Sequence, residues 1–140
     1  MRLMMLGAVA LVLAAAAGAE VKRIDLGGYA GKAVVNSAYR KGNEIRVYVT
    51  GSSSVLPQEL GQVAIREIAE LTKAKGLPRF AVTKISDCGT LRMYNVAVSS
   101  SCRLLGRMLD ENETATAEGK REVTYFRTDD VLAGRMEPSS

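Results

Sequence analysis

Cys88 and Cys102 are the only cysteines of the chain, and their chemistry is the best defined that the sequence offers. An even cysteine count in a small domain of an oxidising compartment predicts a disulfide. A zinc site is disfavoured, because two thiolates without any histidine do not complete a tetrahedral shell. A C-x-x-C redox motif is also absent. We predict one intramolecular disulfide with a short hairpin around Tyr94–Asn95 between its ends; a disulfide between two chains is the alternative.

Chemistry that needs an imidazole is excluded, because the chain contains no histidine. Ser-His and Cys-His nucleophiles are therefore absent, and no serine belongs to a G-x-S-x-G or S-x-x-K motif. The adjacent Asp129 and Asp130 suit a helix start better than acid–base catalysis, and the acidic loop 110–113 lacks calcium-loop spacing. We predict no catalytic, cofactor-binding or metal site, and no cofactor.

Residues 1–19 are typical of a secretory signal peptide. Arg2 provides a short positive region, and the run from Leu3 to Leu13 is apolar residues and glycine only. Small residues then lead to a predicted cleavage site between Ala19 and Glu20. An uncleaved membrane anchor is the alternative, although the apolar run is shorter than the roughly 20 residues of a spanning helix. No cysteine follows for lipid attachment, so we expect a periplasmic protein without a stable membrane span, with release from the cell as an alternative.

The charge is only mildly basic, with 19 Lys and Arg against 15 Asp and Glu in 140 residues. No basic stripe with interleaved aromatics is visible, so nucleic acid is not an expected partner. One group of basic residues has two interpretations. It is either a solvated strand face or a surface that binds an anionic lipid or polyanion. Its members are Arg103, Arg107, Lys120, Arg121 and Arg127.

The elements that would position these residues follow from apolar periodicity. Residues 33–39 and 44–50 flank Gly42–Asn43, and the second run alternates strictly, which predicts a hairpin. A helix is predicted over 57–75, because Pro57 suits a first turn and apolar residues then recur at steps of three and four. This apolar stripe consists of Leu60, Val63, Ala64, Ile68, Leu71 and Ala74.

Further strands are expected over 79–85, 91–98, 102–109 and 122–126, with a last helical turn after Thr128. The predicted fold is α+β with two layers: a mixed or antiparallel sheet of four to six strands and one long amphipathic helix on one face. The predicted organisation is an N-terminal linker over 20–32, a single α+β domain over 33–136 and a frayed tail over 137–140.

Residues 42–85 resemble a family of small proteobacterial envelope and periplasmic proteins, often lipoproteins, of uncharacterised role. The resemblance is carried by the runs Gly42–Gly51, Arg66–Thr72 and Phe80–Val82, with Gly76 between helix and strand. It implies a strand–helix–strand core and no enzyme activity, and it supplies no catalytic residues.

Two functional hypotheses follow. The first is a non-enzymatic exported protein that acts by contact with a protein or envelope partner, as an envelope adaptor or a stress-related factor. The alternative is a small enzyme or an enzyme inhibitor with a pocket of carboxylate, tyrosine or lysine side chains that no motif reveals. A deep cleft lined by convergent Asp, Glu or Lys side chains would favour the enzyme, whereas a flat sheet face with a modest apolar patch would favour the contact protein.

Overall fold

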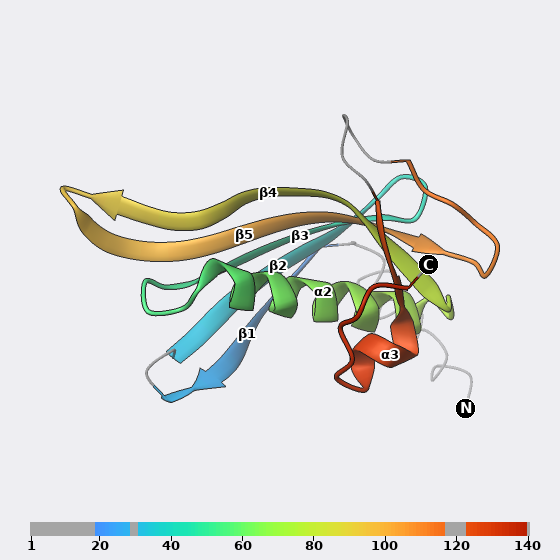
Figure 1. Cartoon of the computed structure of the whole chain (residues 1–140), viewed down its shortest axis with the longest axis horizontal. Coiled ribbons are helices and arrows are strands. Elements are labelled where there is room, and N and C mark those ends of the chain that lie inside the picture. Colours follow the sequence, from blue (N-terminus) through green and yellow to red (C-terminus); the bar gives the residue numbers. More distant parts are fainter. Residues whose placement is uncertain (1–18, 29–30, 117–122, 140) are drawn as a thin grey trace, which may run out of the picture.

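The computed structural model describes residues 19–28, 31–116 and 123–139. One antiparallel six-stranded sheet, in the order β1-β2-β3-β5-β4-β6, carries α2 across one face (Figure 1). This confirms the predicted α+β class. The elements are β1 (Ala19–Gly27), β2 (Gly31–Arg40), β3 (Glu44–Ser52), α2 (Pro57–Ala74), β4 (Arg79–Met93), β5 (Val96–Leu109), β6 (Thr124–Arg127) and α3 (Thr128–Leu132).

The main helix is short relative to β4 and β5, two of the strands against which it packs. The 18 residues of α2 span about 27 Å at 1.5 Å per residue. The 15 residues of β4 span about 50 Å at 3.3 Å per residue. The predicted long helix is therefore an ordinary one, and it leaves the far end of β4 and β5 without a covering layer.

Two boundary predictions are wrong. The expected linker over 20–32 is mostly strand, because β1 pairs with β2 from Ala19↔Ala38 to Gly27↔Gly31. The expected frayed tail over 137–140 is held at Ser139, whose N–H donates to the Tyr125 carbonyl at 2.7 Å. The α+β domain therefore includes residues on both sides of the predicted range 33–136.

The core lies between α2 and the sheet face that it covers. Ile45, Val47 and Val49 of β3 are fully buried there, which confirms the strict alternation seen in the sequence. On the helix, Leu60, Ala64 and Ile68 of the predicted stripe are buried. The remaining stripe positions are half-buried (Val63 and Leu71) or exposed (Ala74), whereas Glu67, Ala69 and Thr72 are buried.

The helix packs tightly against the sheet at Gly106 of β5. A Cβ atom at this position would lie 2.9 Å from Cδ1 of Ile68 and 3.3 Å from the carbonyl oxygen of Ala81. Glycine is therefore required here because a buried isoleucine of the helix occupies the space of a side chain.

Candidate functional site

The end of the β4–β5 hairpin projects past α2 and past the loop that precedes it (Figure 1). We call residues 86–101 the arm. Its turn is formed by Tyr94 and Asn95, with φ angles of 52° and 66°. Two successive positive φ angles are typical of the tight turn that matches strand twist, and asparagine tolerates them well. The hairpin predicted around these two residues is confirmed. The separate strand expected over 91–98 is wrong, because this turn divides the range between β4 and β5.

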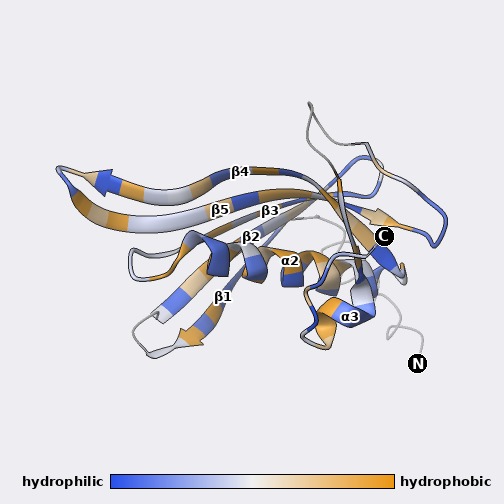
Figure 2. Cartoon of the chain, in the orientation of Figure 1, coloured by the Kyte–Doolittle hydropathy of each residue, from blue (hydrophilic) through white to orange (hydrophobic). Residues whose placement is uncertain are grey.

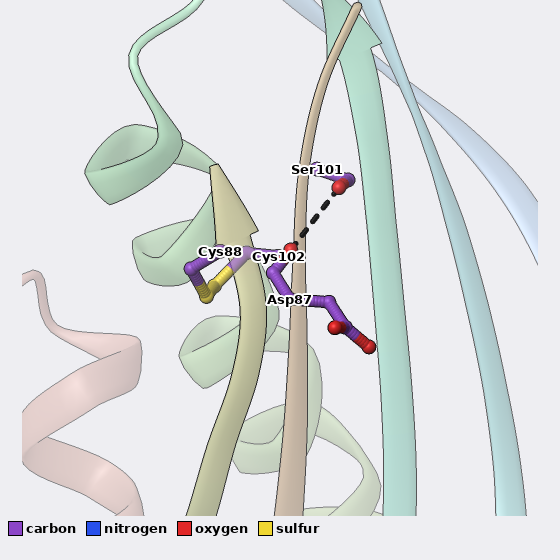
Figure 3. Close-up of a disulfide and its surroundings, with 4 residues drawn as sticks. All are labelled: Asp87, Cys88, Ser101 and Cys102. Carbon is purple, nitrogen blue, oxygen red and sulfur yellow. Dashed lines mark hydrogen bonds between the residues drawn. A yellow bond between two sulfur atoms is a disulfide. The ribbon is translucent and has the colours of Figure 1, made fainter. Parts of the chain in front are cut away.

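The Cys88–Cys102 disulfide joins β4 to β5 at the base of the arm (Figure 3). The predicted intramolecular pairing is therefore seen in the structure. Next to it, the Ser101 hydroxyl donates to the Asp87 carbonyl at 3.1 Å. The two cysteine side chains point to one side of the strand pair, and the Asp87 side chain points to the other (Figure 3). The arm thus begins where the disulfide fixes β4 relative to β5.

Hydrophobic residues occur on both strands of the arm (Figure 2), and the large apolar side chains among them are exposed. Tyr94, at the tip, is 97% exposed, and the others expose about half of their surface or more. Several large apolar side chains exposed within one short hairpin are uncommon on a soluble monomer and are typical of an interaction site. The apolar residues are Leu91, Met93, Tyr94, Val96 and Val98.

An apolar groove of about 330 Å³ lies beside the disulfide, between the first half of α2 and β4. Its walls include Ile65 and Gly61 of the helix and Ile85 of the strand, with both cysteines between them. Gly61 brings the helix close to the disulfide, because a Cβ atom there would lie 3.7 Å from the Cys102 sulfur. The groove and the arm share the disulfide as a common border.

The outer edge of β4 is irregular. In the part of the chain that the structure describes, β6 pairs only with residues Arg79–Val82 of this edge. The register of β4 shifts between Val82 and Lys84, between Ser86 and Gly89, and again between Leu91 and Arg92. Irregularities of this kind disfavour the addition of another strand along this edge.

The sheet face opposite α2 contains a hollow of about 470 Å³. Asp87 is the one carboxylate among the described residues that line it; the other charged residues there are Arg40, Arg46, Lys84 and Arg103. No group of three or more His, Cys, Asp or Glu that would hold a metal occurs within residues 19–28, 31–116 and 123–139. The hollow therefore combines one carboxylate with one lysine and three arginines.

The basic group predicted from the sequence is only partly brought together. Arg127 is engaged elsewhere, because its guanidinium donates to both carboxylate oxygens of Glu111 at 2.6 and 3.2 Å. These hydrogen bonds lower the pKa of Glu111 and raise the pKa of Arg127. Residues 120 and 121 lie outside the described residues. Arg103 instead has cationic neighbours from other strands, which the sequence does not reveal.

One buried carboxylate, Glu67, is not indicated by the sequence, because it lies outside the predicted apolar stripe of the helix. Glu67 is buried and forms an ion pair with Lys22 of β1, and the Ser37 hydroxyl lies 3.5 Å from its Oε1. Lys22 also donates to Glu70 at 2.8 Å. Partial burial lowers the pKa of Lys22, but the two carboxylates outweigh this effect and raise the pKa above its usual value of 10.5.

Lys22→Met is expected to lower the free energy of unfolding at pH 7 by about 1–3 kcal/mol, because it leaves Glu67 buried without its cation. The expected loss is below that of a fully buried pair, because the Lys22 side chain is 32% exposed. A raised lysine pKa stabilises the fold below pH 10.5, and this stabilisation is lost as the pH rises through the folded-state pKa. Urea unfolding should therefore show the difference from wild type shrinking above pH 10.5.

Lys73→Met is the matched control for this prediction. Lys73 pairs with Asp129 at 2.8 Å, but both side chains are mostly exposed, so the change should cost well under 1 kcal/mol. Equal losses for the two variants would contradict a special role of the Lys22–Glu67 pair.

Comparison of the chain with protein-family models, curated proteins and solved structures finds no match. The resemblance of residues 42–85 to small envelope proteins therefore stays a prediction. The predicted signal peptide lies outside the described residues except for Ala19, and cleavage before Glu20 would remove only this first residue of β1. No helix in the described ranges is long and apolar enough to cross a membrane.

Proposed function

We propose that this is an exported, non-enzymatic periplasmic protein that acts by contact, as an envelope adaptor or a stress-related factor, through its arm. One observation carries the proposal: the apolar side chains of the arm lie beyond the reach of α2 and remain exposed. Exposing them costs free energy in water, and a partner surface that covers them recovers it.

The partner is a protein with an apolar surface, as the composition of the arm indicates. Asp87 and Arg92 are the only charged residues among its 16 positions, so charge gives little of the recognition. Tyr94 presents an aromatic ring with a polar hydroxyl at the tip, the combination that is enriched at the energetic centres of protein interfaces. The disulfide holds the arm in one position before binding, which reduces the entropy lost on association.

The first test is photo-crosslinking in living cells with a photoreactive amino acid in place of Tyr94. The expected result is a crosslink to one defined protein in the periplasmic fraction, on a chain that begins at Glu20. The same group in place of Val21, an exposed apolar residue of β1, should give no such crosslink.

The second test measures the affinity of the purified partner for a triple variant, Leu91→Ser, Met93→Ser and Val96→Ser. Affinity is expected to fall at least tenfold, because three exposed anchor side chains are lost, while the melting temperature stays near that of the wild type. Val21→Ser is the control and should bind as the wild type does.

Three outcomes would overturn the proposal. Unchanged affinity of the triple variant would show that the arm is not the contact surface. A crosslink only to lipid would make the arm a membrane-binding element, and a crosslink only to a second copy would make it an oligomerisation element.

A further inference from the structure

Leu105 of β5 marks an unusual place on the open face of the sheet. Its side chain is only 7% exposed, although α2 lies on the opposite face. Its register partners are Arg46 on β3 and Lys84 on β4, and Arg103 and Arg107 flank it two positions away on its own strand. Leu105 is therefore surrounded by cationic residues, whose apolar stems are long enough to cover it.

Three of these cations line the hollow of about 470 Å³, and Arg40 is a fourth. Arg40 lies 3.7 Å from Glu44, and Arg103 lies 3.7 Å from Asp87. Both distances are long for charge-assisted hydrogen bonds, so these two carboxylates neutralise Arg40 and Arg103 only weakly. The three arginines therefore carry positive charge to the hollow that Glu44 and Asp87 do not fully cancel.

Arg103 is held in position by an aromatic side chain. Its guanidinium carbon lies 4.8 Å from the centre of the Tyr48 ring, on the neighbouring strand β3. Tyr48 and Arg103 are direct register partners, so the stacking follows from the pairing of the two strands. The contact orders the guanidinium of Arg103 without using its hydrogen-bond donors.

Gathering like charges on adjacent strands costs free energy, and this cost is relieved when an anion binds between them. The spacing suits a group with several oxygens, because neighbouring strands lie about 4.8 Å apart and successive residues on one face about 6.6 Å apart. One carboxylate is satisfied by one guanidinium, whereas phosphate groups accept from several cations at once. The volume is also within the range of small-molecule sites, roughly 300–1,000 Å³.

We propose that this hollow binds a phosphate-bearing ligand of the diphosphate class, held by Arg46 and Arg103 with Arg40 at its margin. The site lies on the open face, apart from the apolar side chains of the arm tip, and does not depend on the function proposed for the arm. The phosphate groups belong either to a free ligand or to lipid headgroups at a membrane surface. The experiment separates these two sources.

The experiment uses the mature chain and two probes. Inorganic pyrophosphate is titrated by calorimetry, and co-sedimentation is measured with vesicles of phosphatidylglycerol and phosphatidylcholine against vesicles of phosphatidylcholine alone. Arg46→Gln with Arg103→Gln is expected to weaken binding at least tenfold. Arg23→Gln is the control, because Arg23 is exposed on β1 of the same face but does not line the hollow. Thermal melts of each variant confirm that the fold is intact.

Binding of pyrophosphate that the double variant loses, and that Arg23→Gln retains, supports a site for free diphosphates. Binding of the anionic vesicles alone, with the same dependence on the variants, supports a site for headgroup phosphates. Two results would overturn the proposal: binding of neither probe, or an equal loss in Arg23→Gln, which would show diffuse attraction to the basic surface.

Discussion

Replacing Ile68 by alanine is expected to lower the free energy of unfolding by about 2–5 kcal/mol. Ile68 is fully buried in α2, and its side chain fills the space above Gly106 of β5. Gly106 has no side chain that could fill the volume vacated by Ile68, so a cavity remains. Chemical denaturation followed by circular dichroism measures this loss. It would be a large part of the free energy of unfolding of a typical domain, which is roughly 5–15 kcal/mol.

Leu71→Ala is the control for this prediction, because Leu71 is on the same helix but only half-buried. Its loss should be clearly smaller than that of Ile68→Ala. Gly106→Ala adds a second test, since its new methyl group would press against Ile68 and should cost about 1–3 kcal/mol. If Ile68→Ala and Leu71→Ala cost the same, the helix is rotated relative to the arrangement described here.

Removal of the disulfide by Cys88→Ala with Cys102→Ala is expected to cost about 3 kcal/mol, the value for a closed loop near 15 residues in the chain-entropy model. The loss of stability should be concentrated in the arm. Amides of residues 89–101 should exchange with solvent faster, because the covalent link at the base of the hairpin is gone. Hydrogen exchange by mass spectrometry measures the arm separately from the rest of the sheet.

The triple arm variant is the control for this experiment, because it changes exposed side chains and keeps the disulfide. In this variant, hydrogen exchange at residues 45–49 of β3 should match that of the wild type. Unchanged exchange in the cysteine variant would mean that strand pairing alone orders the arm. Two free thiols in the unreduced, unfolded wild-type protein would contradict the disulfide itself.

Elements with a strict apolar period could be predicted from the sequence, and β1 shows why another could not. In β3, alternate residues are apolar, and the buried side is therefore obvious. In β1, the residue that faces Glu67 is Lys22, so a charge occupies a position that would otherwise be apolar. The pattern of a half-buried strand is lost whenever a partner on another element neutralises an inward-facing charge.

The site was predictable only where local residues define it. Two cysteines and a turn at Tyr94–Asn95 suffice for the disulfide and its hairpin. The exposure of Leu91 and Met93 does not follow from the sequence, because a strand covered by a helix shows the same alternation of apolar residues. Whether these side chains are covered or exposed depends on how far α2 extends along the sheet. The cations of the hollow come from separate strands, so only the strand order brings them together.

The position of β5 between β3 and β4 also determines the order in which the protein assembles. The chain leaves the ribosome N-terminus first, so β1, β2, β3, α2 and β4 all emerge before β5 is complete at Leu109. β3 and β4 do not pair with each other, and each pairs with β5 along most of its length. Strand pairing therefore joins the two parts of the sheet only through β5, and a chain that ends before residue 96 lacks the strand that pairs with both.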